Sequence, residues 1–82
     1  MINELLNNKN KAIGLKQVTK AIESDSTNVV IIAEDADEKI TAKIKGLCKL
    51  HDCKIVSADS MKNLGKLSGI SVGASVVCIM KE

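Results

Sequence analysis

Residues 28–33, Asn-Val-Val-Ile-Ile-Ala, form a run whose apolar side chains fall on both faces of an extended strand. A strand with one face in solvent alternates apolar and polar residues, whereas a run that is apolar on both faces is typical of a central strand covered on both sides. Helices packed on the two faces of a sheet supply such cover. The run therefore favours a sheet between two helical layers.

Turn signals and short apolar segments elsewhere predict alternating helices and strands. Further strands are expected at 11–13, 54–57 and 75–80, and helices at 3–8, at 16–23, from the EDADE segment (34–38) through about 50, and from Ser60 to before Gly69. Asp35, followed three residues later by Glu38, resembles a capping box for the third helix. These elements predict an α/β protein: a three-layer αβα sandwich with a central mixed four-stranded sheet, in one domain of residues 1–82.

The amino-acid composition of the chain excludes some classes of function. The chain has no Phe, Tyr or Trp, which excludes the stacking of bases on aromatic rings that many RNA-binding sheets use. Its twelve basic residues are all lysines and its net charge is only +2, which indicates a local basic face. With no apolar run of about 20 residues and no leader pattern, we expect a soluble, cytoplasmic protein.

The stretch 12–22, Ala-Ile-Gly-Leu-Lys-Gln-Val-Thr-Lys-Ala-Ile, places Gly14 directly before a helix. At about 100° per residue, Lys16, Gln17 and Lys20 lie together on the outer side. The opposite side docks on the sheet and carries Val18, Ala21 and Ile22. Gly14 permits another backbone to come close, and the free N–H groups of a helix N-terminus favour an anion. An anion-binding surface and an ordinary solvated helix face both remain open.

A second segment, 64–74, is Leu-Gly-Lys-Leu-Ser-Gly-Ile-Ser-Val-Gly-Ala. It has glycines at 65, 69 and 73, and it lacks the spacing of a phosphate-binding Walker A loop. Ile70 and Val72 lie in a loop where nothing requires apolar residues. The segment is either an apolar contact surface or a helix end at Gly69 whose loop residues tuck beneath their own turn.

The cysteines and the single histidine favour a structural interpretation. Cys48, His51 and Cys53 do not have the C-x-x-C spacing of a metal site, and Cys48 falls on the buried face of its helix. Cys78 lies in the last strand and is expected in the core. His51 is expected at an exposed helix end, with no nucleophile and acid arranged beside it. We therefore expect no catalytic residue, no metal and no cofactor.

Four segments of the chain together resemble a known family. They are IGLKQVTKAIE, VVIIAEDADE, LCKLHDCKI and LGKLSGISVGASVVCI, and they span about residues 3–80. In order and spacing they are similar to the ribosomal-protein superfamily named for its eukaryotic large-subunit members seven-A and thirty, most closely to its small bacterial branch. The resemblance implies an αβα sandwich that binds kink-turn RNA, a sharply bent internal loop closed by tandem sheared G·A pairs.

The resemblance also implies roles for particular residues. Gly14 would admit the RNA backbone, Lys16 and Gln17 would reach guanine edges, and Lys20 would contact a nearby base or phosphate. The 69–74 loop would pack against splayed bases, with an acid at Asp37 near the same site. The implied RNA-binding residues are Gly14, Leu15, Lys16, Gln17, Lys20, Asp37, Gly69, Ile70, Ser71, Val72, Gly73 and Ala74. Many relatives instead carry Asn-Glu at 16–17 and a basic residue with proline at 72–73.

Two functions of different classes follow. The first is a non-catalytic, ribosomal-protein-like RNA-binding module whose partner is a structured RNA with a kink-turn, either ribosomal RNA or an mRNA or riboswitch. We expect it to be a monomer that binds neither DNA nor membranes. The second is a protein-interaction or small-anion-binding module that uses the same surface without RNA.

Overall fold

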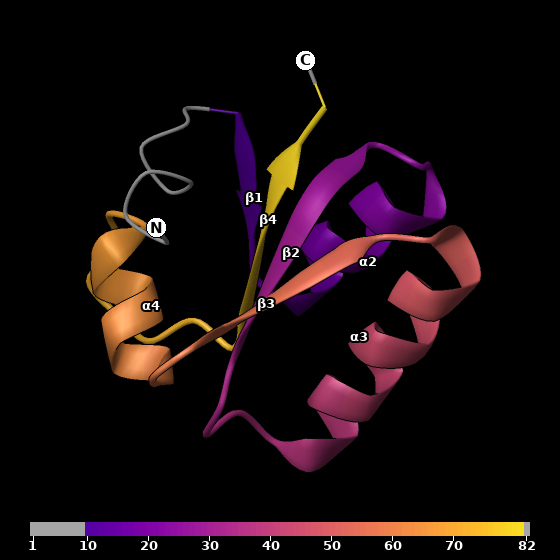
Figure 1. Cartoon of the computed structure of the whole chain (residues 1–82). Coiled ribbons are helices and arrows are strands. Elements are labelled where there is room, and N and C mark those ends of the chain that lie inside the picture. The colour runs from indigo at the N-terminus through magenta and orange to yellow at the C-terminus, as the bar shows by residue number, and fades with distance from the viewer. Residues whose placement is uncertain (1–9, 82) are drawn as a thin grey trace.

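The computed structural model describes residues 10–81 and contains four strands and three helices (Figure 1). In chain order they are β1 (Lys11–Ile13), α2 (Leu15–Glu23), β2 (Thr27–Ala33), α3 (Glu38–His51), β3 (Lys54–Ala58), α4 (Met61–Leu67) and β4 (Val76–Met80). Each predicted element within this range is confirmed, with bounds that agree to within about a residue except at the start of α3. The helix expected at 3–8 lies outside the described residues. No helix between residues 10 and 81 is long and apolar enough to cross a membrane.

The sheet has the strand order β1-β4-β2-β3 and is mixed. β2 pairs in parallel with β3, while β4 runs antiparallel to both β1 and β2. Two strands distant in sequence, β2 and β4, therefore form the centre of the sheet.

Both central strands are covered on both faces, as the run at 28–33 predicts. Val30 and Ile32 of β2 pack beneath α2 and α3, whereas Val29 and Ile31 point to the other face and pack with Leu64 of α4. Of the described helices, Figure 1 shows α4 on one side of the sheet and α2 and α3 on the other. The αβα sandwich is thereby confirmed. Since alternate residues of one strand enter separate clusters, β2 ties the two layers together.

The N-cap residue of α4 agrees with its prediction, whereas the N-cap residue of α3 does not. Ser60 caps α4 as expected, its side chain accepting a hydrogen bond from the Asn63 N–H at 3.0 Å. The capping box beginning at Asp35 is wrong, because the N-cap of α3 is Asp37, whose Oδ1 accepts from the Lys39 N–H at 2.8 Å. Asp35 instead accepts from the Met61 N–H at 2.7 Å, at the start of α4.

Candidate nucleic-acid interface

Backbone hydrogen bonds bring three connecting segments to one end of the sheet. The Gly14 N–H, at the start of α2, donates to the Val76 carbonyl at 3.0 Å. The Ala33 N–H, at the end of β2, donates to Ser75 at 2.9 Å, and the next residue, Glu34, bonds to Ala58 of β3. The start of α2, the β2–α3 loop and the α4–β4 loop therefore meet at this end. We call residues 14–17, Lys20, Asp37 and 69–74 the candidate interface.

The α2 start is open to a partner. Gly14 is its N-cap residue, with φ 97° and ψ 156°, a conformation essentially restricted to glycine. Among residues 10–81, no side chain caps this helix and its first turn carries no acid. Apart from Gly14 and its two chain neighbours, no described residue has an atom within 4 Å of where a Gly14 Cβ would be. Backbone conformation, and not internal packing, is therefore the reason for glycine here.

The two predicted faces of α2 are confirmed. Lys16, Gln17 and Lys20 are exposed, and the side facing the sheet is buried, comprising Val18, Ala21 and Ile22. Leu15 is half-buried and packs against the cluster beneath α2 and α3. Two cationic side chains and an amide thus stand beside an uncapped helix N-terminus, whose dipole favours negative charge.

The α4–β4 loop combines both interpretations drawn from its sequence. Gly69 has φ 85°. Its N–H donates to the Lys66 carbonyl at 3.1 Å, and the Ile70 N–H donates to the Gly65 carbonyl at 3.0 Å. This pair of bonds is a Schellman motif, in which the Ile70 side chain returns to the helix. Ile70 is accordingly half-buried against the core, as the helix-end alternative predicts, whereas Val72 is 69% exposed.

The remaining residues of the α4–β4 loop are likewise partly exposed and partly buried. Ser71 and Gly73 are exposed, while Ala74 is buried and its N–H donates to the Met61 carbonyl at 2.9 Å. Ala74 therefore anchors the loop. Gly65 is required beneath the loop, because a Cβ there would collide with the Val72 carbonyl oxygen.

Sequence reasoning missed the residues of α4 that lie beside this loop. A pocket of about 300 Å³ separates helix and loop, lined by Lys62, Lys66, Ile70, Ser71, Val72 and Gly73. The two lysines are four residues apart, hence on one face of α4. That spacing is visible in the sequence, but the return of the loop against the helix is not.

Asp37 is exposed at the candidate interface, with its carboxylate already engaged as the α3 cap. The second acid of this loop, Asp35, fixes the start of α4 through its bond to Met61. Since the Met61 carbonyl accepts from the Ala74 N–H, a short chain of hydrogen bonds links the β2–α3 loop, the start of α4 and the α4–β4 loop. The α2 start is attached separately, through the bond from the Gly14 N–H to the Val76 carbonyl at the start of β4.

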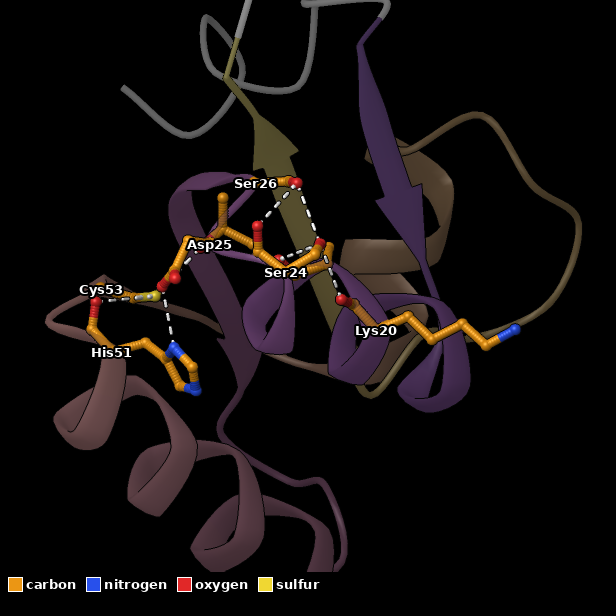
Figure 2. Close-up of polar contacts among 8 residues, drawn as sticks. Lys20, Ser24, Asp25, Ser26, His51 and Cys53 are labelled. Carbon is orange, nitrogen blue, oxygen red and sulfur yellow. Dashed lines mark hydrogen bonds and ion pairs between the residues drawn. The ribbon is translucent and has the colours of Figure 1, made fainter.

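The cysteines and His51 lie away from this end. Cys48 and Cys78 are buried in one core cluster, as predicted, and burial raises the pKa of each thiol to about 11. His51 ends α3 but is not freely exposed: its Nδ1 lies 2.8 Å from Oδ1 of Asp25, which joins α3 to the α2–β2 turn (Figure 2). The half-buried Cys53 thiol lies 3.0 Å from the Thr27 hydroxyl. Across residues 10–81, no three His, Cys, Asp or Glu side chains gather as metal ligands would.

Fold and site together define a class: a small αβα sandwich that presents a helix N-terminus and a glycine-flanked loop at one end of its sheet. The model of the ribosomal protein L7Ae/L30e/S12e/Gadd45 family matches residues 1–82, and the chain belongs to this family. The family resemblance seen in the sequence is thereby confirmed.

Relatives agree with this family assignment, and a solved structure shows the same fold. The chain is 46% identical over 68 residues to an RNA-binding protein of Bacillus pumilus, covering 83% of each chain. It is 41% identical over 69 residues to an RNA-binding protein of Halalkalibacterium halodurans, and 39% identical over 69 residues to the RNA-binding protein YbxF of Geobacillus stearothermophilus, covering 84% of each chain in both cases. A solved protein of unknown function from Bacillus halodurans shares the fold, with a TM-score of 0.85 at 19% identity over 98% of this chain and 80% of that chain.

Proposed function

We propose that this protein is a non-catalytic RNA-binding module that recognises kink-turn RNA at the candidate interface. Its family and the naming of its relatives as RNA-binding proteins support RNA as the partner. The observation that carries the proposal is the meeting of the uncapped α2 start with the exposed Val72 loop at one end of the sheet. We further propose that it acts as a cytoplasmic monomer.

The chemistry of these groups suits a kinked RNA. The major groove of regular A-form RNA is too narrow for side chains, but a kink opens it. Lys16 and Gln17 can then donate to guanine N7 and O6, and Lys20 can contact a base or phosphate next to them. Gly14 leaves room for the RNA backbone at the positive end of α2.

The loop supplies the second half of the recognition. Bases splayed out of a kink expose apolar faces, and the chain has no aromatic ring on which to stack them. Val72 offers an aliphatic contact instead, while Ile70 supports it from below. Because both halves are fixed by the fold, an RNA must be bent to touch them together, which provides selection by shape.

Titration of the protein with a kink-turn duplex, and with a duplex in which Watson–Crick pairs replace the tandem G·A pairs, tests the proposal. We expect tight binding of the first and only weak phosphate contacts with the second, because phosphate contacts position a protein while base contacts specify the sequence. Equal affinity for the two RNAs would refute kink-turn recognition. Binding of neither RNA would favour the protein-interaction or small-anion alternative.

A further inference from the structure

The exposed face of α3 carries a concentration of positive charge outside the candidate interface. Its lysines, Lys39, Lys43, Lys45 and Lys49, are all exposed. None of the four takes part in an ion pair within the described part of the chain, and the single acid of the helix is Glu38 in the first turn. A third of the twelve lysines of the chain therefore lies on this one helix.

Helix geometry places these lysines in two rows. Measured at about 100° per residue from the buried Ile44, Lys45 and Lys49 fall near +100° and +140°, and Lys39 and Lys43 fall near −140° and −100°. Small residues, Ala42 and Gly46, occupy the outermost strip between the rows. The face thus has a low centre and two edges that carry lysines, with Glu38 near +120° at the beginning of the Lys45 row and the exposed Leu50 near −120° at the end of the Lys39 row.

The structure fixes which row faces which neighbour. A pocket of about 240 Å³ is bounded by Thr41 and Lys45 of α3 and by Ile55 and Ser57 of β3, so the Lys45 row lies on the β3 side. The Lys39 row then lies on the opposite side, toward α2, which packs with α3 over the same face of the sheet. The lysines of α3 and those of α2 therefore lie on the same outer surface, that of the helical layer formed by α2 and α3.

That surface begins at the candidate interface. α2 and α3 both start at this end of the sheet, after Gly14 and Asp37, and both end where Asp25 and His51 are hydrogen-bonded. The two helices are consequently parallel. An RNA held at the α2 start and continuing as a duplex along these helices would pass over the lysine rows of α3.

We infer that the outer face of α3 is a second RNA-binding surface, which takes the phosphate backbone of a duplex arm that leaves the kink; the inference rests on the proposed function. The minor groove of A-form RNA is wide and shallow, with a phosphate backbone on each side. The low strip at Ala42 and Gly46 fits the floor of such a groove, and the two lysine rows meet the two backbones. Recognition here is by shape and charge, without base readout.

Kink-turn duplexes in which each arm is separately shortened or extended by about one turn test the inference. For wild-type protein we expect extension of one arm to tighten binding about tenfold at low salt, because phosphate contacts are added. The Lys43→Gln/Lys49→Gln variant removes one lysine from each row and should lose this gain, with a salt slope less steep by about 1.5 on the long-arm RNA. It should bind the short-arm RNA as wild type does.

Two further variants act as controls. Lys54→Gln/Lys81→Gln removes two exposed lysines that lie outside the helices and should keep the gain from the longer arm. Gly46→Gln keeps the charge but fills the central strip with a residue that helices accept, and should reduce the gain while the circular dichroism spectrum stays that of a folded protein.

The outcomes separate this inference from the proposed function. If the short-arm RNA binds and neither arm's extension changes affinity, the α3 surface is refuted and the candidate interface stands. If no kink-turn RNA binds, both fail. A Lys43→Gln/Lys49→Gln variant that changes only self-association in sedimentation, with RNA affinity unaltered, would assign the face to a second copy of the chain and overturn the inference.

Discussion

Gln17 and Val18 are neighbours in sequence but lie about 100° apart on α2, one exposed and one fully buried. Gln17→Ala should weaken specific kink-turn binding by about 1–3 kcal/mol if its amide contacts a base, and should change the free energy of unfolding by no more than about 0.5 kcal/mol. Val18→Ala should do the reverse, lowering stability by roughly 2 kcal/mol. Denaturant melts and RNA titrations measure both. If a folded Gln17→Ala protein binds the RNA as tightly as the wild type does, the exposed face of α2 is only a solvated face.

Gly14 and Gly46 form a matched pair, since neither would place a Cβ within 4 Å of a described atom. They differ in backbone conformation: Gly14 has φ 97°, whereas Gly46 lies inside α3. Gly14→Ala should therefore lower the free energy of unfolding by about 1–3 kcal/mol, and Gly46→Ala should raise it by about 0.5–1 kcal/mol. Urea denaturation distinguishes the two. Equal effects would mean that φ at Gly14 is not the constraint.

The buried thiols predict a loss of stability at alkaline pH. Burial raises the pKa of Cys48 and Cys78 from 9.0 to about 11, so between these values an unfolded chain loses thiol protons that the folded chain keeps. Deprotonation then favours unfolding, and stability should fall as pH rises from 9 toward 11. Cys78→Ala should reduce this slope in urea melts across the same range. An identical slope in the variant would contradict the assignment.

At the scale of the elements, the sequence predicts most of the fold because local patterns decide it. A strand with apolar residues on both faces must be central, and α2 separates its exposed lysines from its buried Val18 by helical period alone. What it cannot predict are contacts between distant segments. Asp35 and Asp37 are equally suited to cap α3, and only the approach of Met61, 26 residues away, shows that Asp35 serves α4 instead.

The same reasoning explains which features were missed, outside the site and within it. His51 shows its helix-end position in the sequence, but its partner Asp25 is again 26 residues distant. The pocket beside Lys62 and Lys66 exists because the loop folds back over Gly65, where a side chain would block it. Each of these features depends on tertiary contacts, and no local pattern encodes them.

Substitutions of the two apolar residues of the α4–β4 loop should have opposite effects on RNA binding and on stability. Val72 is exposed and Ile70 packs against the core as part of the Schellman motif. Val72→Ser should weaken kink-turn binding severalfold and change stability by less than about 0.5 kcal/mol. Ile70→Ser should lower stability by roughly 1–2 kcal/mol through lost apolar burial. Thermal melts and RNA titration of both variants measure this, and a Val72→Ser protein that binds as wild type would remove the loop from the interface.

At the scale of the whole molecule, different segments lie at the two ends of the sheet. One end gathers the α2 start and the two loops; bonds through Asp35, Met61 and Ala74 join the two loops, and the bond from Gly14 to Val76 joins the α2 start to β4. The other end is closed by the Asp25–His51 bond between the end of α3 and the turn after α2. A substitution at that bond can therefore alter stability without reaching the candidate interface, which lies one helix length away.

Charge distribution predicts how RNA binding depends on salt. The net charge is only +2, and the lysines that α2 and α4 bring to the candidate interface are few, namely Lys16, Lys20, Lys62 and Lys66. Each phosphate neutralised contributes about 0.7 to 0.9 to the slope of log K against log salt concentration. For a short-arm kink-turn RNA we therefore expect a slope no steeper than about −3.5, measured by titration between about 50 and 200 mM salt. A slope that implies about eight contacts would show non-specific coating of the RNA by the lysines, and shape recognition at one end of the sheet would then be the wrong account of how this protein binds.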